Sequence, residues 1–169
     1  MVYVDGTFRT APPPYTQFFT IHGELNDHIL KLACGLLNNK TTAAYEEVFR
    51  EVANRIHVVT GQPWVVREMV TDYETAIINA AENTFPGISI YGCYFHFTKA
   101  IWRKVQQLGL SVQYRQIADV RNFIRRVMAL GFLPINIVRM NWNRYRNSPQ
   151  TQALGAIQKG RHRGEREGR

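Results

Sequence analysis

The chain has few of the features from which disulfide-rich, membrane-spanning and secreted proteins are built. Its 169 residues include only two cysteines, Cys34 and Cys93, which are too few for a disulfide framework. No apolar run approaches the roughly 18 residues that a transmembrane helix needs. The opening residues, MVYVDGTFRT, lack the basic segment and the long apolar core of a secretory signal. These absences predict a folded intracellular protein that is not secreted.

Positive charge is concentrated near the carboxyl end. Up to Val138 there are 13 Lys/Arg against 11 Asp/Glu, and from Arg139 onward there are 8 against 2. Residues 159–169 include no apolar side chain, and this composition predicts disorder. We therefore expect a folded domain over residues 1–138 and a basic, partly disordered tail over residues 139–169. The tail could neutralise DNA phosphates, or it could be a solvated segment without a partner.

Changes in hydrophobic period along the chain predict five strands and four helices. The first three strands are joined by short connections, which favour an antiparallel meander. The predicted elements are strands at Met1–Val4, Tyr15–Ile21 and His28–Leu37, a helix at Thr42–His57, a strand at Trp64–Val70, a helix at Glu74–Phe85, a strand at Ile88–Phe95, and helices at Phe97–Leu108 and Gln113–Leu130. This order predicts an α/β fold with a mixed sheet and helices on both of its faces.

Two acids, Asp5 and Asp72, each follow a predicted apolar strand. If the first and fourth strands pair in parallel through a right-handed crossover, both strands end at the same edge of the sheet. Adjacent strands lie roughly 4.8 Å apart, so two carboxylates there can ligate a divalent cation, or two cations with a third acid. In an in-line displacement at a phosphodiester, one such cation activates the attacking oxygen and the other stabilises the leaving oxygen.

Each acid also has a simpler interpretation. Asp72 could cap the helix that begins near Glu74, and Asp5 with Gly6 could form a plain turn. The occurrence of both acids at strand ends in this order of elements favours the metal site.

Cys93 and His96 lie at the end of the fifth predicted strand. They could be half of a zinc site, but a closed site needs four ligands, and Cys34, His22 and His28 would have to converge on them. Cys93 is more simply interpreted as a small buried core residue. His96 could cap a helix, contact a phosphate or support a metal ligand.

Three basic residues, Lys99, Arg103 and Lys104, recur at helical spacing after His96. They could form a basic face beside the acids, where a polyanion would need one. A solvated helix face is the alternative.

Several ordered segments resemble the transposase domain of Mutator-like elements (MULE). They are VDGTF at 4–8, LNNKTTAAYEEVFREV at 37–52, VTDYETA at 70–76, CYFHFTKAIWRKVQQLGL at 93–110 and IRRVMALGFLP at 124–134. The resemblance covers roughly residues 1–138 and implies an RNase H-like fold with a DDE-type site. Such a site cuts and joins DNA with two divalent cations, Mg²⁺ or Mn²⁺. The resemblance places the first two acids at Asp5 and Asp72, and the family's Cys-x-x-His signature at Cys93 and His96.

The resemblance departs from the family pattern after Val138. Members of the family supply a third acid, a Glu on a late helix within a segment similar to Tyr-Phe-Glu, and no such segment follows here. The remaining acids, Glu165 and Glu167, lie in the basic tail, which cannot hold a carboxylate with the precision that catalysis demands. The sequence therefore looks like a truncated or decayed copy with weak or no activity.

Three functional interpretations remain open from the sequence. The chain is a transposase domain acting on transposon ends and target DNA, a non-catalytic nucleic-acid-binding remnant, or a plain α/β interaction module. The first of these implies a nuclear location and leaves self-association as an expectation.

Overall fold

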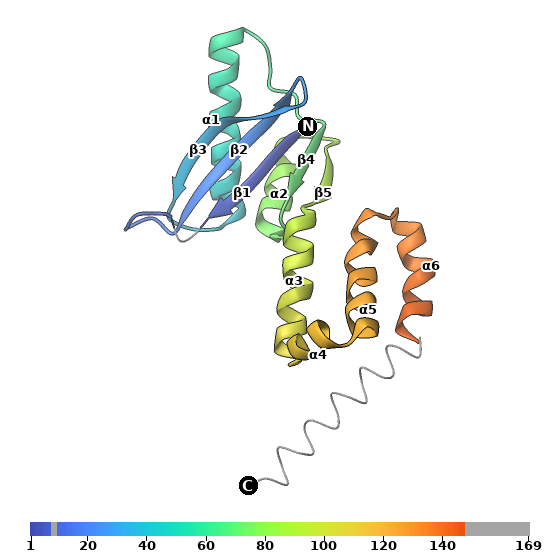
Figure 1. Ribbon diagram of the computed structural model, residues 1–169. Coiled ribbons are helices and arrows are strands. Elements are labelled where there is room, and N and C mark those ends of the chain that lie inside the picture. The colour runs from blue at the N-terminus through green and yellow to red at the C-terminus, as the bar shows by residue number, and fades with distance from the viewer. Residues whose placement is uncertain (8–9, 148–169) are drawn as a thin grey trace. The chain divides into compact units, whose positions relative to one another are not determined.

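The computed structural model describes residues 1–7 and 10–147 (Figure 1). The chain divides into two compact units, Met1–His96 and Phe97–Arg169. A helix, α6 (Ile135–Arg146), crosses the boundary expected between domain and tail at Val138, because apolar residues continue through Met140 and Trp142. The remainder of the predicted tail, residues 148–169, lies outside the described residues.

The first unit is built on one five-stranded sheet with the strand order β3-β2-β1-β4-β5. The β1–β2–β3 meander is antiparallel, β4 pairs with β1 in parallel, and β5 pairs with β4 in parallel. This confirms the predicted mixed α/β sheet, in an RNase H-like layout. The elements of this unit are β1 (Val2–Thr7), β2 (Gln17–Leu25), β3 (His28–Leu37), α1 (Thr42–Thr60), β4 (Glu68–Thr71), α2 (Thr75–Thr84) and β5 (Ser89–Gly92).

Helix α1 begins and ends at the signals in its sequence. The Thr41 side chain accepts a hydrogen bond from the backbone N–H of Ala44 at 3.3 Å, which satisfies one of the unpaired donors of the first turn. At the other end, Gly61 has a φ of 69°, a left-handed conformation that glycine adopts without steric cost. The crossover helix between β3 and β4 is therefore specified locally.

One face of the sheet carries the core of the first unit. Phe19 packs against Tyr45 and Phe49 of α1, with ring centroids 5.1 and 6.2 Å apart. Ile77 and Ala80 of α2 belong to the same buried cluster. Within this unit both helices therefore pack on a single face, whereas the sequence predicts helices on both faces. Strand alternation places Tyr3, Asp5 and His22 on the opposite face.

Strands β1, β2, β4 and β5 differ from their predicted bounds, because pairing, and not local propensity, sets strand length. Strand β1 continues through Asp5 to Thr7, since these residues pair with Phe18–Thr20 of β2. The alternative interpretation of Asp5 and Gly6 as a plain turn is therefore excluded. Strand β5 ends at Gly92, opposite Thr71, where β4 also ends. The predicted strand over 88–95 is thus too long, and Tyr94 already begins the next helix.

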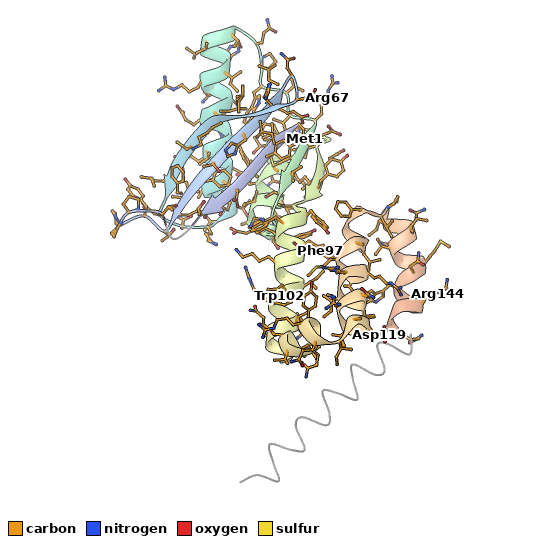
Figure 2. All side chains as sticks on the ribbon, in the orientation of Figure 1. Met1, Arg67, Phe97, Trp102, Asp119 and Arg144 are labelled. Atoms are coloured by element: carbon orange, nitrogen blue, oxygen red, sulfur yellow. The ribbon has the colours of Figure 1, made fainter. Side chains whose placement is uncertain are left out.

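The second unit is helical. It contains most of α3 (Tyr94–Gln107), with α4 (Ser111–Gln116), α5 (Ala118–Ala129), the 3₁₀ turn η1 (Leu130–Phe132) and α6. The single helix predicted over 113–130 is divided at Ile117, whose backbone is extended with φ −108° and ψ 116°. The buried core of the second unit consists of Val105, Leu110, Val120 and Ile124. Trp102 on α3 (Figure 2) contacts the Tyr114 ring.

Across the described residues, no helix is both long and apolar enough to span a bilayer.

Candidate metal centre

The parallel pairing of β1 with β4 sets the geometry of the candidate site. Val2 is opposite Met69 and Tyr3 is opposite Val70. When this register is continued by two residues, Asp72 falls beside Asp5. Since the side-chain period of a strand is two, Asp5 belongs to the face opposite α1 and α2, and Asp72 directly follows the end of β4 at Thr71.

Asp5 sits within a strand and still presents its carboxylate to solvent. Its backbone pairs with Thr20, whose hydroxyl donates a hydrogen bond to the Asp5 carbonyl oxygen at 3.3 Å. The Asp5 side chain is 52% exposed. The strand thus fixes the backbone of Asp5 while the charged group remains accessible to a ligand.

Asp72 does not cap α2. Glu74 occupies the N-cap position, and Oδ1 of Asp72 accepts a hydrogen bond from the backbone N–H of Glu74 at 3.0 Å. This is the local turn that Asp side chains stabilise. The bond uses one of the two carboxylate oxygens and restricts the rotation of the side chain.

His96 reaches the site from the first turn of α3. Its Nε2 lies 3.8 Å from Oδ1 of Asp5, and its side chain is 25% exposed. The Nδ1 atom is buried and makes no hydrogen bond within the described part of the chain. His96 is therefore close enough to influence the orientation of the Asp5 carboxylate.

Cys93 connects the same region to the end of β4. Its backbone N–H donates to the carbonyl oxygen of Thr71 at 2.7 Å, which places Cys93 next to Asp72 in the register. The side chain is only partly buried, whereas the sequence favours a small buried core residue there. Cys34 lies on β3, and β3 and β5 are opposite edges of the sheet. Cys34 therefore does not complete a zinc site with Cys93.

Glu74 is an acid near the site that was not among the predicted residues. Its carboxylate accepts a hydrogen bond from the Tyr45 hydroxyl at 2.7 Å and forms an ion pair with Lys40 at 3.3 Å. The same hydroxyl lies 2.9 Å from Oε1 of the fully buried Gln17. A hydroxyl has only one proton to donate. Tyr45 therefore donates it to Glu74, because that hydrogen bond is shorter and charge-assisted. The segment VTDYETA contains this acid two residues after Asp72, but spacing alone does not reveal which way an N-cap side chain turns.

The environment of Tyr45 suppresses its ionisation. Burial, followed by the hydrogen bond to the Glu74 carboxylate, raises the pKa of the Tyr45 hydroxyl well above its ordinary value of 10.0. A phenolate there would lose its hydration and face a carboxylate. Tyr45 therefore remains a donor to Glu74 throughout the neutral range.

The two carboxylates fit one hard divalent cation better than two. Mg²⁺ and Mn²⁺ prefer oxygen ligands, and Mg²⁺ is commonly held by one or two carboxylates together with water and substrate phosphate. Among residues 1–7 and 10–147, no group of three or more His, Cys, Asp or Glu side chains is arranged to hold a metal ion. Asp5 and Asp72 would therefore hold a single cation, with His96 beside them.

The predicted basic residues Lys99, Arg103 and Lys104 are all exposed on α3. They belong to the second unit, and their contact with DNA stays a prediction. Glu165 and Glu167, the acids of the predicted tail, lie outside the described residues.

Comparison with known proteins identifies the family. The family model of the MULE transposase domain matches residues 1–100, a range that includes Asp5, Asp72, Cys93 and His96. Neither a curated protein nor a solved structure matches the chain. The match spans more than half of the 169 residues, and the chain therefore belongs to the MULE transposase domain family.

Proposed function

We propose that this transposase-derived domain binds one divalent cation, Mg²⁺ or Mn²⁺, between Asp5 and Asp72 and contacts DNA. The observation that supports this most directly is the parallel pairing of β1 with β4, because Asp5 lies on β1 and Asp72 directly follows β4. The family relationship supports DNA as the substrate and a nuclear location.

The reaction of this site is DNA cleavage and strand transfer at transposon ends. When bound, a divalent cation there supplies positive charge that stabilises the attacking or leaving oxygen of a phosphodiester. Asp5 and Asp72 supply the fixed oxygen ligands, and the hydrogen bond from the Glu74 backbone holds Asp72 in place. His96 orients the Asp5 carboxylate from 3.8 Å away.

This chain on its own is weakly active or inactive in that reaction. A second cation needs further fixed ligands, and two carboxylates do not provide them. The same lack of ligands for a second cation supports the non-catalytic alternative. In that alternative the domain keeps the fold and binds DNA without cutting it.

Thermal unfolding in the presence of Mn²⁺ tests the cation site. A ligand that binds only the folded state stabilises it by about 2.7 kcal/mol at a hundredfold excess over its Kd. We expect Mn²⁺ to raise the Tm of the wild type and to have no effect on Asp5→Asn or Asp72→Asn, because an amide has no charge to offer. Asp119→Asn, in the first turn of α5, is the matched control and keeps the effect. Equal Mn²⁺ stabilisation in all four proteins would mean that the cation binds elsewhere.

A further inference from the structure

Strand β3 forms an edge of the sheet and exposes an unusual number of apolar side chains. It is ten residues long and has no proline. The exposed side chains are Ile29 at 60%, Leu30 at 47%, Leu32 at 51% and Leu36 at 39%. An unpaired apolar edge is a template for another strand, and this surface is not part of the cation site.

A bulge in β3 changes which residues share a face. Before the bulge, Lys31 is opposite His22, and after it, Ala33 is opposite Ile21, so Leu32 is the extra residue. The Leu32 side chain lies over Gly23, on the same face of the sheet as helix α1. As a result, residues 28, 30, 32, 33, 35 and 37 lie on the α1 face, and residues 29, 31, 34 and 36 lie on the opposite face.

This arrangement makes β3 complementary to itself. When two copies of the strand overlap completely in antiparallel orientation, each residue pairs with one from the same face. Ile29 is then opposite Leu36, Leu30 opposite Gly35, Lys31 opposite Cys34 and Leu32 opposite Ala33. Without the bulge, every one of these pairs would join residues from opposite faces, which regular pairing forbids.

We propose that β3 pairs antiparallel with β3 of a second copy of this chain, in the register that aligns residue 28 with residue 37. The resulting contact is a two-fold symmetric dimer with a continuous sheet. Because both copies use the same edge, the contact closes and leaves no further β3 edge free. No two like charges oppose each other, and the Ile29–Leu36 pair buries apolar surface on both copies.

A cavity beside β3 supplies space for the side chains of the second copy. It measures about 430 Å³ and lies between the carboxyl half of β3 and the first half of α1. Ala33, Leu37, Val48 and Val52 contribute to its lining. In the proposed register, Leu30 and Leu32 of the second copy face this half of the strand. The larger side chains of one copy thus meet the small residues and the cavity of the other.

The single lysine of the strand does not protect this edge. Lysine on an edge strand commonly prevents association by pointing a charge outward. Here the Lys31 ammonium lies over the Phe18 ring, 5.7 Å from its centroid, so the charge is directed across the sheet.

Sedimentation of the full chain tests the proposal. We expect a wild-type dimer that dissociates on dilution, and a monomer for Leu32→Lys, whose charge would be buried against Ala33 of the second copy. Val59→Lys changes another apolar residue, 82% exposed at the end of α1, and should remain dimeric. A wild type that is monomeric at every concentration would overturn the proposal, as would a Leu32→Lys dimer of wild-type affinity.

Cross-linking tests the register separately and does not depend on the stability of Leu32→Lys. Lys31→Cys places a new thiol opposite the native Cys34 of the second copy, within the Cα separation that a disulfide spans. Under a mild oxidant this variant should form a covalent dimer, and adding Cys34→Ser should abolish it. Leu36→Cys introduces the same number of thiols out of register and should not cross-link. Equal cross-linking of Leu36→Cys would show that the register is wrong.

Discussion

Nε2 of His96 lies 3.8 Å from Oδ1 of Asp5, and this contact joins the first turn of α3 to the middle of β1. The separation is longer than a hydrogen bond. A contact of this length between partly exposed side chains contributes at most about 1 kcal/mol to stability. The contact therefore matters more for the orientation of the carboxylate than for the free energy of folding.

His96→Gln should weaken cation binding with little loss of stability. Residues that orient a metal ligand typically change affinity by about ten- to a hundredfold when they are replaced. Mn²⁺ titration followed by calorimetry measures this change, and the thermal midpoint without metal measures stability. His57→Gln, an exposed histidine in the last turn of α1, is the control and should match the wild type. An unchanged Mn²⁺ affinity in His96→Gln would leave His96 with a packing role alone.

Tyr45→Phe should destabilise the first unit by about 1 to 3 kcal/mol, because it leaves the Glu74 carboxylate without the hydroxyl proton that it accepts. The ring contact with Phe19 at 5.1 Å is retained, so the loss isolates the hydrogen bond to Glu74. Urea unfolding measures the change. Tyr15→Phe removes an exposed hydroxyl and should cost almost nothing, and a similar cost for both variants would contradict this account.

The same variant should alter stability at alkaline pH. The pKa of Tyr45 is raised in the folded state by burial and then by Glu74, so the folded protein holds this proton more tightly than the unfolded chain does. The contribution to stability is complete below pH 10, the ordinary tyrosine pKa, and it is lost as the pH rises above that value. The free energy of unfolding of the wild type should therefore fall more steeply above pH 10 than that of Tyr45→Phe, by about 1.4 kcal/mol per pH unit. Parallel slopes for the two proteins would exclude Tyr45 as the titrating group.

The sheet could be predicted from sequence because its order follows from connection lengths and the handedness of one crossover. The same reasoning brought Asp5 and Asp72 to neighbouring strands. The end of β5 could not be predicted, since the run Ile88–Phe95 is rich in strand-forming residues and only the length of β4 shows where pairing stops. The break between α4 and α5 at Ile117 could not be predicted either, because no glycine or proline lies beside it.

The sequence indicates Asp5 and Asp72 as a candidate pair of acids but gives no information on their surroundings. Glu74 could be read from the sequence only as the start of a helix, whereas its contacts with Tyr45 and Lys40 depend on how α1 packs beside α2. The approach of His96 to Asp5 likewise depends on α3 beginning at Tyr94, two residues after β5 ends. Tertiary contacts of this kind carry no local sequence signal.

Removing three basic residues from α3 should weaken DNA binding. Each phosphate contact that is lost reduces the slope of log affinity against log salt by about 0.9. We expect the combined change of Lys99, Arg103 and Lys104 to Gln to reduce both the affinity and the slope, measured by fluorescence anisotropy with duplex DNA. A control that replaces Arg50, Arg55 and Arg67 removes equal charge from the first unit. Equal losses in both triple variants would mean that net charge, and not the α3 face, governs binding.

The last prediction is that the purified chain does not nick supercoiled DNA in the presence of Mg²⁺ or Mn²⁺. Phosphodiester cleavage of this type needs two cations held about 3.5 to 4 Å apart, and two carboxylates leave the second cation with too few fixed ligands. Loss of one cation removes several kcal/mol of transition-state stabilisation, and about 1.4 kcal/mol corresponds to a tenfold loss of rate. The rate should therefore be indistinguishable from that of a control carrying both Asp5→Ala and Asp72→Ala.

Robust nicking by the wild type that disappears in the double variant would overturn this prediction, because a third acid of the chain would then have to reach the site. Glu74→Gln and the pair Glu165→Gln with Glu167→Gln would identify it. Glu74 is engaged by Tyr45 and Lys40, so its recruitment would require those two contacts to break, and Tyr45→Phe would then increase the rate. Recruitment of Glu165 or Glu167 would leave the rate insensitive to Tyr45→Phe, and the two origins of the third carboxylate are distinguished by that one comparison.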